Sequence, residues 1–259
     1  MQDTLKIAII QSDLVWENPK ENRSRFTKKM ASITMPIDVI LLPEMFTSGF
    51  TMNPENVFET IQGQTIAWMK KTANEKQAAI GGSLVIKEND VFYNRFVFVK
   101  PNGCIETYDK RHTFTLAGED RVYKAGTKKV VFDFKGWKLC PLVCYDLRFP
   151  VWSRNVENYD VLMYVANWPK PRINAWDALL KARAIENMCY CIGVNRVGLD
   201  TNNHEYSGHS AVYNGLGNLL TSLKNNEEGI EIVSLEKNHV STIRNKLKFL
   251  DDRDPFTVM

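Results

Sequence analysis

The stretch VILLPE, residues 39–44, places four apolar residues before Pro43 and Glu44. A short run of Val, Ile and Leu is typical of a buried strand, and proline ends the strand because it has no N–H to donate. On its N-terminal side, KIAIIQ (residues 6–11) predicts another strand, and apolar residues at helical spacing predict a helix over residues 19–33. The order strand, helix, strand is typical of an α/β layer fold rather than of a helical bundle.

The same alternation continues on the C-terminal side. VFYNRFVFV (residues 91–99) and residues 104–108 flank Pro101-Asn102-Gly103, a turn sequence that predicts a hairpin, so antiparallel strands are expected beside parallel ones. The remaining expected elements are helices over 65–74 and 176–188, strands over 79–86, 130–134, 138–143, 161–165, 188–194 and 229–235, and two short strands beyond Ser210 around Asn214 and Gly217.

Length and composition favour one domain. The chain has 259 residues, of which 44% are hydrophobic, and we find no linker, repeat or low-complexity segment. A single α/β domain over residues 1–259 is therefore expected. Its 33 Lys and Arg nearly balance 30 Asp and Glu without a basic block, so the charge does not indicate a nucleic-acid partner.

Targeting and cysteine patterns give further expectations. Residues 1–11 lack the basic and long apolar regions of a signal peptide, and no apolar run reaches transmembrane length, so we expect a cytoplasmic protein without a membrane partner. The five cysteines are odd in number and lack paired CxxC spacing, which disfavours a disulfide framework or a metal site. We predict that all but Cys144 are buried small hydrophobes.

Three chemically useful side chains follow predicted strands. They are Glu44 after VILLP, Lys110 after residues 104–108, and Cys144 after LCPLV. Ligands in α/β folds bind beyond the carboxyl ends of strands, so these positions are candidates for a site. A thiol needs a nearby base or positive charge to become a nucleophile at neutral pH, and Glu44 and Lys110 could supply both. Each residue alone is also compatible with a strand cap, a solvated turn or core packing.

Such a trio supports hydrolysis of an amide. Glu44 would accept the proton of Cys144, whose thiolate attacks the amide carbonyl. Lys110 and a backbone N–H just after Cys144 would stabilise the oxyanion. Ammonia would leave a thioester, which water activated by Glu44 then hydrolyses.

The segments around these residues resemble the three catalytic motifs of the nitrilase superfamily of carbon–nitrogen hydrolases, and the similarity extends over nearly the whole chain. The segments are LLPEMFTSGF (41–50), YDKRHTF (108–114) and LVCYDLRFPVWSRN (142–155). The resemblance implies a four-layer α-β-β-α sandwich in which Glu44 is the base, Lys110 the oxyanion donor and Cys144 the nucleophile. It also implies a second glutamate, Glu119, which orients the lysine or assists proton transfer unless it is only a solvated loop carboxylate.

The oxyanion amide would belong to Tyr145. Family members commonly form homodimers, and the chemistry calls for no metal or organic cofactor.

Within this family the sequence resembles the omega-amidase branch, through CYDLRFPVWSRN, YVANWP (164–169) and ARAIEN (182–187). Its substrates are small amides, the monoamides of dicarboxylic acids such as 2-oxoglutaramate and 2-oxosuccinamate, which need a cation for the distal carboxylate. Arg148 is the candidate, because a guanidinium binds a carboxylate through two hydrogen bonds, although an ion pair with Asp146 is equally compatible with the sequence. Four further residues are candidates for the pocket, or alternatively for the core or a turn: Phe50, Phe114, Asn167 and Trp168.

Three other functions remain open at this point. Another branch, such as a nitrilase or an N-carbamoyl amino acid hydrolase, would share the trio and differ in its pocket. A catalytically silent binding protein would have no chemical reason to keep all three residues. A Cys-His peptidase would use His112 or His209 as its base.

Overall fold

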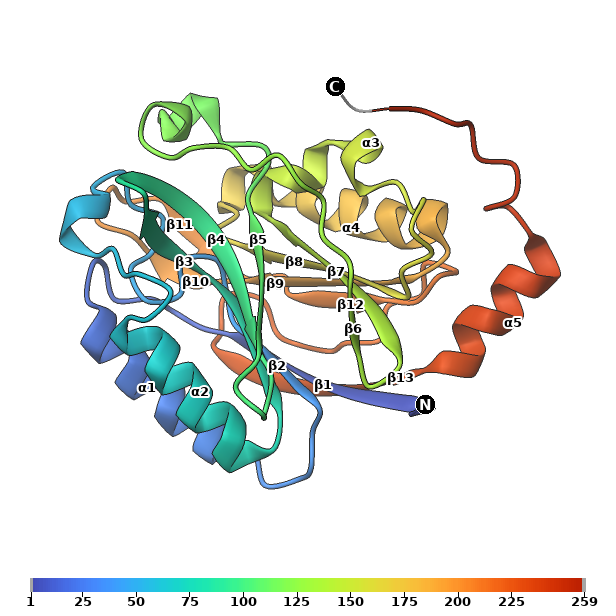
Figure 1. The fold of residues 1–259 in the computed structure, drawn as a ribbon, viewed down its shortest axis with the longest axis horizontal. Coiled ribbons are helices and arrows are strands. Elements are labelled where there is room, and N and C mark those ends of the chain that lie inside the picture. Colours follow the sequence, from blue (N-terminus) through green and yellow to red (C-terminus); the bar gives the residue numbers. More distant parts are fainter. Residues whose placement is uncertain (1, 258–259) are drawn as a thin grey trace.

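Two β-sheets face each other across a shared core in the computed structural model, which describes residues 2–257 (Figure 1). The first sheet has six strands. Their order is β13 (Gly229–Glu236), β1 (Thr4–Gln11), β2 (Val39–Leu41), β3 (Ala79–Glu88), β4 (Val91–Val99) and β5 (Ile105–Asp109). The second sheet has the order β12 (Ala211–Tyr213), β9 (Tyr190–Asn195), β8 (Val161–Ala166), β7 (Trp137–Val143) and β6 (Phe132–Phe134). β10 (Val197–Leu199) and β11 (Glu205–Ser207) form a separate hairpin.

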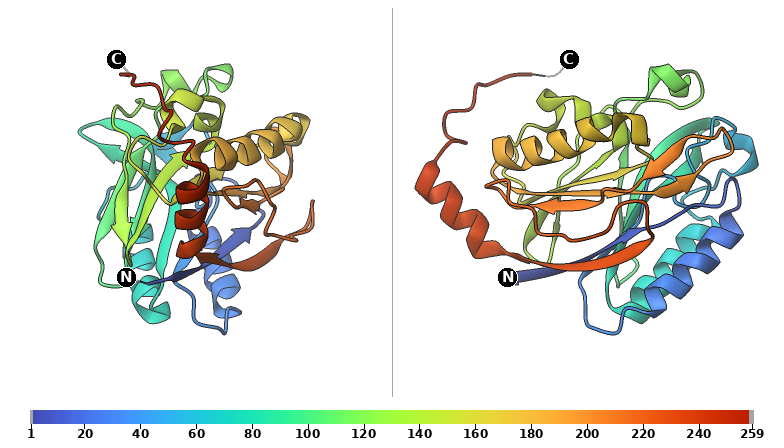
Figure 2. Two further views of the ribbon diagram at one scale, coloured as in Figure 1. Left: turned by 90° about the vertical axis from the view of Figure 1, so that its right-hand side faces the viewer. Right: turned by 180° about the vertical axis from the view of Figure 1, so that it is seen from behind.

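Helices cover the outer face of each sheet. α1 (Pro19–Ala31) and α2 (Gln64–Lys76) lie on the first sheet, α3 (Pro150–Ser153) and α4 (Ile173–Asn187) lie on the second, and α5 (Lys237–Leu247) follows β13 at one end (Figures 1 and 2). This arrangement confirms the predicted α-β-β-α sandwich. Within residues 2–257, each helix is too short or too polar to cross a lipid bilayer.

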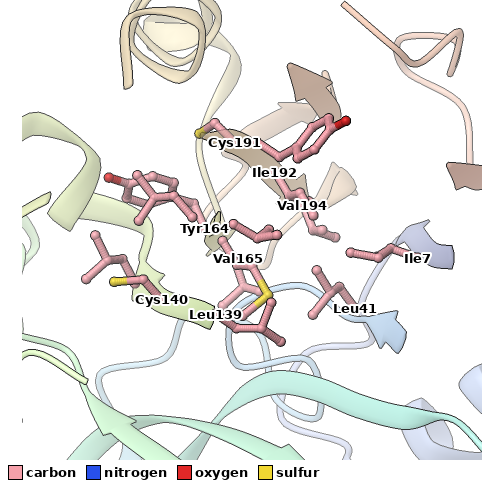
Figure 3. Close-up of a cluster of buried hydrophobic side chains, with 14 of the residues drawn as sticks. Ile7, Leu41, Leu139, Cys140, Tyr164, Val165, Cys191, Ile192 and Val194 are labelled. Carbon is pink, nitrogen blue, oxygen red and sulfur yellow. The ribbon is translucent and has the colours of Figure 1, made fainter. Parts of the chain in front are cut away.

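The layers follow from the alternation of side chains along the strands. In β1, Leu5, Ile7 and Ile9 face the second sheet, whereas Ala8 and Ile10 pack with the helices of the first layer. Figure 3 shows Ile7 and Leu41 on one side of the central core, with Leu139, Val165 and Val194 of the second sheet on the other. Burial of both faces explains why the central strands read as continuous apolar runs.

The direction of the strands determines where the loops meet. β1, β2 and β3 are parallel to one another, and so are β7, β8 and β9. β5 runs in the same direction as β3, because each pairs antiparallel with β4. The segments that follow β2, β5, β7 and β8 converge at one edge of the sandwich, where Glu44 contacts Lys110, Cys144 and Asn167.

Most predicted elements are present within a few residues of their expected bounds. β10, β11 and α5 were not predicted, since β10 and β11 have three residues each and α5 buries only Val240 and Ile243. The second short strand expected beyond Ser210 is reduced to an isolated bridge between Tyr213 and Leu219. The prediction that Cys104 is buried is wrong: Cys104 is exposed, because it lies between the Pro101–Gly103 turn and the start of β5.

Candidate active site

Glu44, Lys110 and Glu119 meet in the interior at the carboxyl ends of the strands. Lys110 Nζ lies 3.0 Å from Glu44 Oε1 and 2.8 Å from Glu119 Oε2. All three side chains are at most 1% exposed. A buried charge is tolerated only when it is paired, and here one ammonium serves two carboxylates. The structure thus brings together two predicted partners, Glu44 and Lys110, and places Glu119 beside them rather than in a solvated turn.

Two asparagines hold Glu44 in place. Asn94, in the middle of β4, donates through Nδ2 to Glu44 Oε1 at 2.7 Å and to Glu119 Oε1 at 3.1 Å. Asn167, which follows β8, donates its backbone N–H to Glu44 Oε2 at 2.8 Å and its Nδ2 to the backbone oxygen of Glu44 at 2.7 Å. These bonds fix the carboxylate of Glu44 and leave little freedom for it to turn away.

Cys144 lies at a sharp turn between β7 and the short 3-10 helix Cys144–Arg148. Its φ of +45° falls in the left-handed region, which is unfavourable for a residue with a side chain and persists only where the surroundings hold it. Burial and the neighbouring charge of Glu44 raise the pKa of the Cys144 thiol well above its usual value, although the ammonium of Lys110 acts in the opposite direction. The resting residue is therefore a neutral thiol that needs a base.

Lys110 and Glu119 show opposing electrostatic effects. Burial acts to lower the pKa of Lys110, but the charges of Glu119 and Glu44 outweigh it, so the pKa of this ammonium is raised. Burial raises the pKa of Glu119 despite the proximity of Lys110. The raised pKa keeps Lys110 protonated at neutral pH, and its charge acts on the Cys144 thiol.

A cavity of about 490 Å³ opens onto Cys144. The five residues predicted for the pocket lie along it, namely Phe50, Phe114, Arg148, Asn167 and Trp168, and so does Tyr145, the residue predicted to supply the oxyanion amide. Some of them have a second role, since Lys110 Nζ lies 5.1 Å from the ring centre of Phe50, and Trp168 also packs in the central core. The backbone N–H of Tyr145 belongs to the first turn of its helix, where amides have no partner within the helix.

Two guanidinium groups face this cavity. Arg148 lies over the ring of Trp168 at 5.0 Å, and Arg172 lies over the ring of Phe114 at 5.2 Å. Within residues 2–257 neither forms an ion pair with a carboxylate. The alternative pairing of Arg148 with Asp146 is absent, because Asp146 binds Tyr108 and His112 instead.

The sequence interpretation missed several residues of the site. The sequence did contain an indication of Asn94, because a polar residue inside the apolar strand VFYNRFVFV must find hydrogen-bond partners when buried. No sequence pattern indicated Arg172 or the residues of the β10–β11 hairpin that line the cavity, which include Asp200 and His204. The two histidines of the peptidase alternative are engaged elsewhere, His112 with Asp146 and His209 with Asp177.

Comparison with known proteins supplies the family. The family model described as carbon-nitrogen hydrolase matches residues 6–245. The chain belongs to the carbon–nitrogen hydrolase family. A solved carbon–nitrogen hydrolase from Xanthomonas campestris, described with an arsenic adduct in its active site, has the same fold. It superimposes with a TM-score of 0.96 at 36% identity, covering 100% of both chains. The predicted family and its nitrilase-like fold are confirmed.

Two curated relatives are similar over almost their full length. The omega-amidase YafV of Escherichia coli (strain K12) is 43% identical over 97% of this chain and 98% of its own. The 2-oxoglutaramate amidase of Bacillus subtilis (strain 168) is 32% identical over 95% of this chain and 96% of its own.

Proposed function

We propose that this protein is an omega-amidase that hydrolyses the terminal amide of a dicarboxylic acid monoamide to the acid and ammonia. The observation that carries the proposal is the buried Glu44–Lys110–Glu119 cluster beside Cys144, together with a cavity at Cys144 that presents two guanidinium groups without an ion pair among the described residues. The names of the two curated relatives support the same reaction and substrate class, with 2-oxoglutaramate and 2-oxosuccinamate as the expected substrates.

The first step is attack of Cys144 Sγ on the amide carbonyl. Because the thiol is neutral at rest, its proton moves to Glu44 as the S–C bond forms. Asn94 and Asn167 hold the accepting carboxylate, so little reorganisation accompanies the transfer. The product is a tetrahedral intermediate with negative charge on the former carbonyl oxygen.

Lys110 and the backbone N–H of Tyr145 are the proposed donors to that oxyanion. A protonated lysine in a buried site stabilises developing negative charge more strongly than it would in water. Glu119 binds Lys110 from one side, which both keeps it protonated and orients its Nζ.

Collapse of the intermediate breaks the C–N bond. Glu44 returns the proton to the departing nitrogen, ammonia leaves, and the acyl group remains on Cys144 as a thioester. Water then attacks the thioester carbonyl while Glu44 accepts its proton, and that proton returns to Sγ as the acid is released. The net reaction consumes one water and regenerates the thiol and the carboxylate.

Arg148 and Arg172 are the proposed contacts for the far end of the substrate. A guanidinium without a carboxylate partner of its own is available for a carboxylate ligand, and aromatic rings hold both groups against the cavity wall. Neutral amides of similar length should therefore bind less well than amides that carry a carboxylate.

Ammonia release from 2-oxoglutaramate, succinamate, N-carbamoyl amino acids and a simple nitrile tests the proposal. Wild-type protein should release ammonia rapidly from the first two, Cys144→Ala should release none, and Arg148→Gln should raise KM about 10-fold or more, the loss expected for one charge-assisted contact. Turnover of a carbamoyl compound or a nitrile instead would identify another branch of the family. No ammonia from any compound would favour a binding protein.

Two further expectations belong to this proposal. A homodimer, if formed, would give about twice the 29.8 kDa mass of the chain by light scattering. A cytoplasmic location is supported by five free cysteines, which a reducing compartment preserves, and cell fractionation would test it. The expected absence of a cofactor remains a prediction.

A further inference from the structure

A buried carboxylate beside the site has no part in the chemistry described above. Asp146 is completely buried, two residues after Cys144. Its Oδ2 accepts from Val143 N at 3.0 Å and from the Tyr108 hydroxyl at 2.8 Å. Its Oδ1 accepts from His112 N at 2.9 Å and contacts His112 Nδ1 at 2.8 Å. Four contacts on one carboxylate satisfy a group that would otherwise be costly to bury.

These contacts connect two parts of the chain. Val143 immediately precedes Cys144, and the bond from its N–H to Asp146 closes the turn in which Cys144 has its unfavourable φ of +45°. Tyr108 and His112 flank Lys110 on both sides. The Tyr108 hydroxyl also accepts from Arg111 N at 3.1 Å and from Trp152 Nε1 at 3.0 Å, so the link extends to α3.

We propose that Asp146 is a positioning residue, which ties the turn that carries Cys144 to the segment that carries Lys110. The inference rests on the proposed function, in which both residues act on one carbonyl group. Strained backbone persists only where its surroundings hold it, and small displacements of reacting groups are costly in rate. Without this link the turn at Cys144 would relax, and Sγ would move relative to Glu44 and Lys110.

Asp146→Asn tests the link with a side chain of the same shape. An amide nitrogen cannot accept a hydrogen bond, so one pair of donors, either Val143 and Tyr108 or the two of His112, loses its partner. We expect kcat to fall about 10- to 100-fold with KM within about threefold, because the residue does not touch the substrate. We also expect alkylation of Cys144 by iodoacetamide to begin at lower pH than in the wild type, because the relaxed thiol is less buried and farther from Glu44.

Asp38→Asn is the matched control. Asp38 is also buried and also accepts from backbone and side chains, at Lys6 N, Gln2 Nε2 and Lys135 Nζ, but it precedes β2 whereas Glu44 follows this strand. The Asp38→Asn variant should lose stability without a change in kcat or in the alkylation profile of Cys144. If Asp146→Asn does not fold, Tyr108→Phe tests the same link. We then expect a smaller fall in kcat and a smaller shift of the alkylation profile to lower pH.

The inference is overturned if the folded Asp146 or Tyr108 variant matches the wild type in kcat and alkylation profile, or if Asp38→Asn changes both equally. Retained turnover in Cys144→Ala would instead refute the proposed function, and the alkylation profile alone would then decide the role of Asp146.

Discussion

At the scale of single residues, the site is a balance of charges that favours a neutral nucleophile. Glu44 and Glu119 share the single ammonium of Lys110, so an ionised Cys144 would add a further negative charge in a buried space. This differs from cysteine enzymes in which a histidinium or a helix terminus stabilises the thiolate at rest. The proton must therefore move during the attack, and Glu44 is the group placed to accept it.

This balance predicts a pH dependence for alkylation. Iodoacetamide reacts with the thiolate, and burial together with Glu44 raises the pKa of Cys144, so the rate should still be rising by about tenfold per pH unit above pH 8. In Glu44→Gln the charge that raises this pKa is removed, so alkylation should be faster at a given pH while amide hydrolysis falls by about 10²-fold or more. Peptide mass spectrometry separates Cys144 from the exposed Cys104. A rate that levels off below pH 7 would contradict the neutral thiol.

Asn94 carries a second prediction at this scale. Its Nδ2 lies between Glu44 and Glu119 and donates to both. Asn94→Ala removes the donor and should cost about 1–3 kcal/mol of stability. Asn94→Asp has nearly the native shape but places a third carboxylate around one ammonium, so it should be the less stable of the two by urea unfolding. Equal midpoints for the two variants would show that volume, not charge, matters at this position.

At the scale of elements, the sequence could locate those site residues that lie at the carboxyl ends of strands. Glu44 and Cys144 each follow an apolar run, and a sheet directs such residues to one edge. Asn94 and Arg172 were not found in this way, because Asn94 lies inside a strand and Arg172 on a loop, and no periodicity indicates which loop faces the thiol. Spacing also could not distinguish a free Arg148 from one paired with Asp146, since the competing partners Tyr108 and His112 come from β5 of the other sheet and from the segment that follows it.

The segment after Glu119 supports the end of β5, because Gly126 packs against the backbone of Asp109 and Lys110. Substitution of Gly126 by Ala should therefore disturb this end of the strand. A Cβ at Gly126 would lie 2.1 Å from the backbone oxygen of Asp109, and the Gly126 N–H donates to the backbone oxygen of Lys110 at 2.8 Å. A backbone atom cannot yield as a side chain does, so we expect a loss of about 1–3 kcal/mol and a lower kcat.

Gly103→Ala, at the other end of β5, is the control for this substitution. Its φ is +82° and a Cβ there meets nothing within 4 Å, so it should cost about 1–2 kcal/mol through backbone strain alone. Urea unfolding and steady-state kinetics on both variants test the difference. A normal kcat in Gly126→Ala would mean that Lys110 does not depend on this contact.

At the scale of the whole molecule, the site exists only because two sheets pack face to face. Glu44, Lys110 and Asn94 come from the first sheet and its loops, whereas Cys144, Asn167 and Arg148 follow strands of the second. The core between the sheets is one continuous cluster that includes residues from β1, β2 and β4 as well as from β7, β8 and β9. Separation of the two sheets would therefore expose this core and disrupt the site at the same time.

We infer that the chain unfolds as one cooperative unit, as the predicted single domain would. Trp68 of α2 packs in the outer layer of the first sheet, and Trp176 of α4 packs on the second, so each reports on one half. In single-tryptophan variants that keep Trp68 or Trp176 and carry Phe at the other five of the six tryptophan positions, the urea midpoint by fluorescence should coincide with the midpoint by far-UV circular dichroism, which follows both halves. Because neither sheet can bury its inner face without the other, an intermediate with one intact half should not accumulate. Two separate midpoints would show that each sheet and its helices are stable alone, and the site would then form only on docking of two preformed halves.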